Sequence, residues 1–155
     1  MARFADTTAQ RDMRRLGIWS LALWGCVSLV GCSTNDYPTS GPGATRTIKA
    51  QPSFAVDIQE VFDRRGCSGA SCHGMAQVEN LDLRSGRAYD DLVNVLSTRT
   101  TQPLVSPGDV ANSYLISKLE GPGVTGGRMP LGAAPLDATD LQNIKNWIAL
   151  GALNN

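Results

Sequence analysis

Residues 67–73, Cys-Ser-Gly-Ala-Ser-Cys-His, place two thiols and an imidazole in one short stretch of chain. Two such thiols can form a disulfide, bind a metal ion, or add to the two vinyl groups of a haem as thioethers. A histidine directly after the second cysteine suits haem iron, as in the attachment spacing C-x-x-C-H. Here four residues separate the cysteines, and a C-x4-C-H spacing also arises in disulfide loops. Residues 68–71 are all small, so the loop can bulge and still bring both sulfurs to a haem.

The N-terminal side of this stretch predicts an exported protein. Residues 1–15 carry four arginines, and residues 16–31 form the apolar run LGIWSLALWGCVSLVG. A basic segment before a short apolar run is typical of an export signal. The run has 16 residues, whereas a helix that spans a bilayer needs about 20. An uncleaved membrane anchor is the alternative.

The end of the apolar run, Leu29-Val30-Gly31-Cys32, resembles the lipobox of bacterial lipoproteins. The resemblance implies a signal peptide over residues 1–31, cleavage before Cys32 and a lipid on the Cys32 thiol. Such acyl chains anchor a protein to a membrane because each buried methylene contributes about 0.8 kcal/mol. Ser33 follows in place of the Asp that favours inner-membrane retention in many such lipoproteins. The expected location is therefore the cell envelope, facing the periplasm or the cell surface, with the outer membrane favoured.

The remaining chain divides into a tether and one small domain. Residues 32–52 comprise the lipidated cysteine and a stretch rich in Ser, Thr, Pro and Gly, which predicts a flexible linker. Residues 53–153 have the length of a single domain. Without residues 1–31 the chain keeps 10 Lys and Arg and 12 Asp and Glu, a net charge near −2. This balance argues against a nucleic-acid partner, which a basic surface would attract.

Apolar spacing predicts an all-α domain of about four short helices. The first ends at Gly66, the second spans about 86–97, the third ends at Gly121, and the last begins at an Asp137 cap and ends at Gly151. No segment alternates convincingly as a strand would. So few short helices make a thin core, and domains of this size usually need a disulfide, a metal or a cofactor. The apolar face of each predicted helix is formed by the following residues: Phe54, Ile58, Val61 and Phe62; Tyr89, Leu92, Val93 and Leu96; Tyr114, Leu115, Ile116 and Leu119; Leu141, Ile144, Trp147 and Ile148.

Elimination leaves one candidate for a second axial ligand of a haem. His73 is the only histidine, so two histidines cannot bind the same iron. Of the four methionines, two fall in the expected signal peptide, and Met75 is too close to His73 to reach the opposite haem face. Met129 lies 56 residues beyond His73, before Pro130, which stiffens the chain. A buried methionine that only fills space in the core is the alternative.

Several segments together resemble class I-like cytochrome c domains of exported bacterial proteins. They are Asp57–Phe62, Cys67–Gly74, Leu81–Leu83, Val105–Asp109, Ser113–Leu119, Gly127–Pro130 and Ile144–Ala152. The resemblance spans about residues 54–152 and implies one covalent haem c. It also implies that Cys67 and Cys72 form the thioethers, that His73 and Met129 are the axial ligands of the iron, and that the last helix packs on the first. The C-x4-C-H spacing is the one departure from the commonest pattern.

A haem with both axial positions filled predicts an electron carrier rather than an enzyme, with a redox protein as its partner. A second hypothesis is a binding or structural lipoprotein with a Cys67–Cys72 disulfide. A third is a zinc site, although Cys67, Cys72 and His73 supply three ligands where structural zinc takes four. A fourth is a haem enzyme in which a small ligand such as peroxide displaces Met129.

Overall fold

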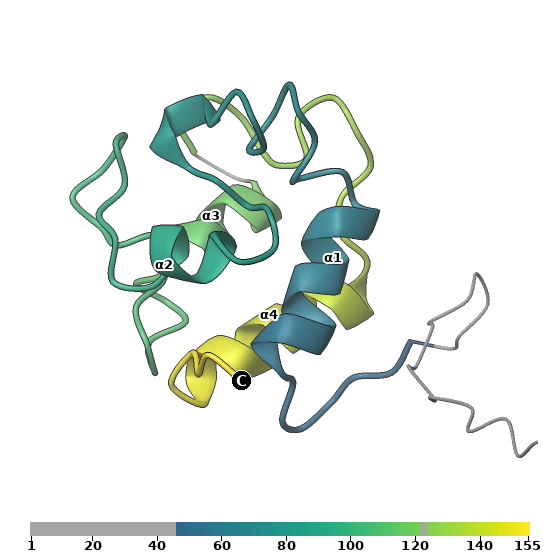
Figure 1. The fold of residues 1–155 in the computed structure, drawn as a ribbon. Coiled ribbons are helices and arrows are strands. Elements are labelled where there is room, and N and C mark those ends of the chain that lie inside the picture. The colour runs from purple at the N-terminus through teal and green to yellow at the C-terminus, as the bar shows by residue number, and fades with distance from the viewer. Residues whose placement is uncertain (1–45, 122–123) are drawn as a thin grey trace, which may run out of the picture. The chain divides into compact units, whose positions relative to one another are not determined.

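The structure, a computed structural model, describes residues 46–121 and 124–155 (Figure 1). Its helical elements are η1 (Phe54–Ile58, a π-helical turn), α1 (Gln59–Arg64), η2 (Val78–Asn80, a 3-10 turn), α2 (Ala88–Leu92), α3 (Tyr114–Glu120) and α4 (Ala138–Ala149). The described residues contain isolated β-bridges but no strand, so this part of the chain is helical. The expected signal peptide, the lipobox with Cys32 and residues 33–45 of the expected tether lie outside the described residues.

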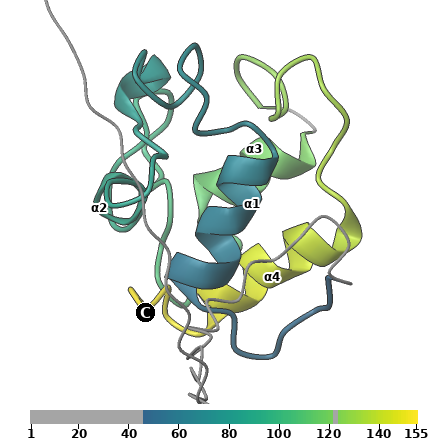
Figure 2. The ribbon, with the colours of Figure 1, turned by 45° about the vertical axis from the view of Figure 1, so that its right-hand side comes forward.

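Helices from the two ends of the domain pack together at its centre. The first helical segment, η1 followed directly by α1, lies against α4 in both views (Figures 1 and 2). The Phe54 ring lies 5.2 Å from the rings of both Tyr89 and Trp147, measured between centroids. Trp147 is only 1% exposed. The apolar faces predicted for the first, third and last helices are buried, apart from Leu141, which is partly buried at the edge of the core.

The second helix is shorter than the sequence predicts. It ends at Leu92, and Val93 already has an extended backbone. Val93 then pairs with Val105, and Asn94 adopts a left-handed φ of 61°. Leu96, predicted to lie on the apolar face, is 67% exposed. Val93 and Val95 are β-branched, and such side chains are stiff in a helical turn, which favours the extended backbone here. The Val95 carbonyl accepts a hydrogen bond from the Leu104 N–H.

Helix α4 begins where the sequence predicts. The Asp137 carboxylate accepts a hydrogen bond from the Asp140 backbone N–H at 2.9 Å, which confirms the predicted cap. This bond lowers the pKa of Asp137, and burial opposes it only in part; the Arg46 guanidinium lowers the pKa further. The helix ends at Ala149, and Gly151 takes a left-handed φ of 97° just beyond it.

We expect Asp137→Ala to lower the free energy of unfolding by about 1 kcal/mol at pH 7, the usual value of an N-terminal cap. Because the folded-state pKa of Asp137 is lowered, this stabilisation is present above its unfolded pKa of about 3.9. It is lost as the pH falls through the lower folded value. Urea titrations between pH 7 and pH 3 measure the effect. Asp137→Asn keeps a capping oxygen and should retain most of the stability; equal losses in both variants would contradict a capping role.

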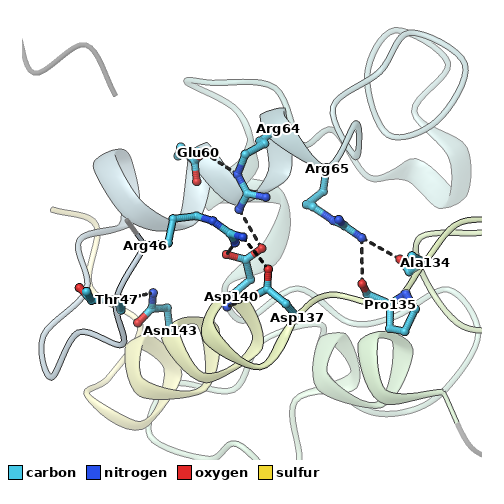
Figure 3. A network of polar contacts seen from close by, with 10 residues as sticks. All are labelled: Arg46, Thr47, Glu60, Arg64, Arg65, Ala134, Pro135, Asp137, Asp140 and Asn143. Carbon is cyan, nitrogen blue, oxygen red and sulfur yellow. Dashed lines mark hydrogen bonds and ion pairs between the residues drawn. The ribbon is translucent and has the colours of Figure 1, made fainter. Parts of the chain in front are cut away.

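Residues 46–49, in the expected tether, lie on α4 (Figure 3). Asn143 accepts a hydrogen bond from the Lys49 backbone N–H at 2.7 Å and donates one to the Thr47 carbonyl at 3.0 Å. Asp140, whose side chain is 2% exposed, contacts Arg46 from this segment and Arg64 from α1, with the Arg64 contact at 2.8 Å. The buried carboxylate therefore joins this segment, α1 and α4.

Within residues 46–121 and 124–155, none of the helices has the length and apolar character to cross a membrane.

Candidate functional site

The stretch 67–73 forms a compact loop directly after α1. The Cys67 N–H donates to the Phe62 carbonyl at 2.8 Å, which extends the helical path beyond Arg64. The Cys72 N–H donates to Gly69 at 2.9 Å, and the His73 N–H donates back to the Cys67 carbonyl at 3.1 Å. The last bond closes the loop, so the four small residues between the cysteines form a bulge. Cys67, Cys72 and His73 are thus held in one turn of backbone.

Gly74 makes this closure possible. It is buried, and a Cβ built on it would lie 2.3 Å from the Ser68 carbonyl oxygen and 2.7 Å from that of Gly69. Both are backbone atoms of the bulge, so a larger residue at this position would force the loop open. The Gly74 N–H also donates to the Gly69 carbonyl at 3.0 Å. The sequence shows a glycine after the histidine, but only the folded loop explains why a side chain is excluded at Gly74.

The His73 ring is oriented by a backbone carbonyl. Its Nδ1 lies 2.8 Å from the Val78 oxygen. A carbonyl oxygen can only accept a hydrogen bond, so Nδ1 carries the proton and Nε2 keeps its lone pair. Burial lowers the pKa of His73, and this outweighs the opposing effects of the Val78 bond, the Glu79 charge and a backbone hydrogen bond to Leu81. A neutral imidazole with a proton fixed on Nδ1 and none on Nε2 is the form in which a histidine binds a metal through Nε2.

The two thiols are free and differ in exposure. Cys67 is partly buried and packs against the apolar core, whereas Cys72 is exposed. Burial raises the pKa of the Cys67 thiol to about 11, so it stays protonated at neutral pH. The structure thus presents two reduced cysteines, one at the core and one at the surface of the same loop.

Met129 lies in the segment between α3 and α4, of which residues 124–137 are described. Its backbone N–H donates to the Lys118 carbonyl at the end of α3, at 2.7 Å, and its side chain packs on the core. Lys118 Nζ donates to the Thr125 carbonyl at 3.0 Å. Arg65 holds the far end of the segment by donating to the carbonyls of Ala134 and Pro135 at 2.7 and 2.9 Å (Figure 3). Met75, by contrast, is 76% exposed.

The loop of His73 and the segment of Met129 lie at the same end of the domain, beyond the ends of α1 and α3, in both views (Figures 1 and 2). Lys118 connects them: its backbone carbonyl binds the Met129 N–H, and its charge contributes to the lowered pKa of His73. The structure therefore brings all four predicted residues of the folded domain, Cys67, Cys72, His73 and Met129, to one end.

Two arginines next to this end in the sequence have a buried side-chain nitrogen without a hydrogen-bond partner. They are Arg65, with Nε, and Arg128, with Nη1. Arg65 precedes the loop, and Arg128 precedes Met129. Buried donors of this kind normally have partners, so a bound group with acceptor oxygens would satisfy them.

One cavity in the described residues does not include Cys67, Cys72, His73 or Met129. In residues 46–121 and 124–155, no three His, Cys, Asp or Glu side chains gather closely enough to hold a metal ion. A shallow cavity of about 260 Å³ is lined instead by residues near the chain ends of the domain: Gln51, Pro52, Trp147, Leu150, Leu153 and Asn155.

Comparisons with known proteins found no match among family models, curated proteins or solved structures. The assignment of a function therefore depends on the residues and geometry described above.

Proposed function

We propose that this chain is an exported, lipid-anchored c-type cytochrome that carries one haem c and transfers electrons. The observation that carries the proposal is the state of His73: its Nδ1–H is bound to the Val78 carbonyl, beside two reduced cysteines in one closed loop. Cys67 and Cys72 would form the thioethers, and His73 would bind the iron. Met129, held on α3 at the same end of the domain, would be the second axial ligand.

The residues around this end fit a haem. A haem carries two carboxylates, which form strong hydrogen bonds with arginine and hydroxyl donors. Arg65 and Arg128, which adjoin the loop and Met129 in the sequence, each have a buried side-chain nitrogen without a partner. These donors lack acceptor oxygens, and the two haem carboxylates would supply them. When bound, haem iron with His and Met ligands supplies a one-electron couple with a raised potential.

The proposed setting is the cell envelope. A lipid on Cys32 would hold the chain to a membrane, with the outer membrane favoured and the domain facing the periplasm or the cell surface. The partner would be another redox protein. The near-neutral charge of the chain after Cys32 favours no nucleic-acid partner.

Expression with a c-type maturation system tests the proposal. We expect a coloured protein whose haem resists acid–acetone extraction and gives the pyridine haemochrome spectrum of two thioethers. Cys67→Ala and Cys72→Ala should each shift this spectrum to that of one thioether, and the double variant should lose covalent haem. Ser71→Ala, in the same loop, is the matched control and should keep it. In the same cells, labelled palmitate should enter the wild type but not Cys32→Ser.

A colourless wild-type chain, produced alongside a control cytochrome that matures normally, would contradict the proposal. Recovery of a Cys67–Cys72 disulfide from that chain would favour the structural-lipoprotein hypothesis instead.

A further inference from the structure

A turn with an unusual backbone follows the cysteine loop. Gln77, Glu79 and Asn80 have φ angles of 45°, 64° and 56°, in the left-handed region. Asparagine tolerates this region, but it is uncommon for Gln and Glu. Three such residues within four positions do not persist without outside support, and they concentrate where a particular geometry serves a function.

The turn presents one group to His73. Val78 lies between the left-handed residues, and its carbonyl oxygen is the one that accepts the His73 Nδ1–H at 2.8 Å. The Val78 N–H donates to the Cys72 carbonyl at 3.1 Å, so the turn is attached to the cysteine loop on its other side. The unusual backbone at residues 77–80 therefore aims the Val78 carbonyl at the imidazole.

A second, distant loop holds this turn in place. The Glu79 carboxylate accepts hydrogen bonds from Arg99 Nε at 2.8 Å and from Thr98 Oγ1 at 2.7 Å, and it also pairs with Arg99 Nη2. These contacts keep the pKa of Glu79 well below its usual range. A guanidinium that binds both carboxylate oxygens fixes their direction, which a lysine ammonium does not.

The loop that carries Arg99 is itself braced. The Leu104 N–H donates to the Val95 carbonyl at 2.7 Å, and the Ser97 N–H donates to the Gln102 carbonyl at 2.9 Å. The Arg99 N–H donates to the Ser97 hydroxyl at 3.1 Å. Arg99 therefore lies in a loop whose backbone is held by hydrogen bonds.

We propose that Thr98 and Arg99 are positioning residues for the axial histidine: they grip Glu79, which holds the Val78 carbonyl against Nδ1–H and so sets the orientation and basicity of the ring at Nε2. The inference rests on the proposed function. Partners of the second ring nitrogen of a metal-binding histidine fix its tautomer and raise its strength as a ligand. Here that control originates at Arg99, 20 residues beyond Glu79 in the sequence.

The test uses the fact that His73 is the only histidine in the chain. The two nitrogen-15 resonances of one imidazole, recorded on the haem-free protein, report its tautomer without overlap. In the wild type we expect the Nδ1–H form to dominate. Arg99→Ala should raise the population of the Nε2–H form about two- to fivefold, the range that the loss of an exposed ion pair allows. Arg99→Lys keeps the positive charge but cannot bind both oxygens of the Glu79 carboxylate. Its Nε2–H population should lie between those of the wild type and Arg99→Ala.

The matched control is Lys145→Ala, which removes a comparable exposed ion pair, with Glu120, that joins α4 to α3. It should leave the tautomer unchanged. The double variant Glu79→Arg with Arg99→Glu exchanges the two charges. Compared with Arg99→Ala, it should recover part of the Nδ1–H population. In the haem-loaded protein, Arg99→Ala and Arg99→Lys should alter the electron paramagnetic resonance g-values of the oxidised iron, and Lys145→Ala should not.

If folded Arg99→Ala shows an unchanged tautomer and unchanged g-values, this inference is wrong. If the same protein carries covalent haem, the proposed function still stands. The reverse result is equally distinct: a protein that never acquires haem contradicts the proposed function. In that case a tautomer shift in Arg99→Ala would still support the positioning of His73 by the Arg99 loop.

Discussion

Met129→Ala is expected to lower the reduction potential of the haem-loaded protein by an amount on the order of 0.1 V. Axial ligands set haem potentials over a range of about 0.8 V, and a Met/His pair lies on its high side. The thioether favours ferrous iron, so its loss, or its replacement by water, stabilises the ferric form. The weak sulfur-to-iron absorption band in the red should also disappear. A potentiometric titration that is monitored by optical absorption measures both effects.

Met75→Ala is the matched control for this experiment. Met75 lies two residues from His73 and is 76% exposed, whereas Met129 is attached to α3 through the Lys118 carbonyl and packs on the core. We expect the potential and the red band of Met75→Ala to equal those of the wild type. If Met129→Ala leaves both properties unchanged while covalent haem is retained, Met129 is not the ligand.

Trp147→Ala is expected to lower the free energy of unfolding by about 3–5 kcal/mol, the usual cost of removing a large aromatic side chain from a core. Trp147 is 1% exposed, and its ring lies 5.2 Å from that of Phe54, between centroids. Its Nε1–H donates to the Leu153 carbonyl at 2.9 Å, so the substitution also leaves that acceptor without its partner. In so small a domain this is a large share of the total stability. Urea unfolding followed by circular dichroism measures it.

Leu150→Ala provides the comparison for Trp147. Leu150 follows α4 directly and is 49% exposed, so we expect a loss within about 0.5 kcal/mol, as for most surface substitutions. A similar small loss for Trp147→Ala would mean that the first and last helical segments do not depend on this side chain for their packing.

The helices that bury a complete apolar face could be predicted from the sequence. Ile58 and Phe62 in the first helical segment, and Ile144 and Trp147 in α4, recur at helical spacing and are buried. The end of α2 could not be predicted, because Leu96 continues the same spacing and yet is exposed. There the competing interaction is between Val93 and Val105, which are far apart in the sequence, and helical spacing contains no information about it.

The parts of the candidate site also differ in whether they could be predicted from the sequence. The loop of Cys67, Cys72 and His73 could be predicted because its groups are adjacent in the sequence. The Val78 carbonyl, the support from Arg99 and the exclusion of a side chain at Gly74 could not. Each depends on where the backbone folds back on itself, and a carbonyl oxygen leaves no mark in the residue type. The left-handed Gln77 and Glu79 run against residue preference, so propensity alone points away from this turn.

If Cys32 carries the proposed lipid, the attachment of residues 46–49 to α4 limits how far the domain can travel from it. Residues 33–45, thirteen in number, are the only ones between that cysteine and the first residue held on the domain. Whatever their conformation, the fourteen residue steps from Cys32 to Arg46 cannot span more than about 50 Å. Diffusion of the carrier would then be confined to a thin layer above one membrane surface. A partner in the same membrane would meet it in two dimensions, whereas one in the opposite membrane would have to extend into that layer to exchange an electron.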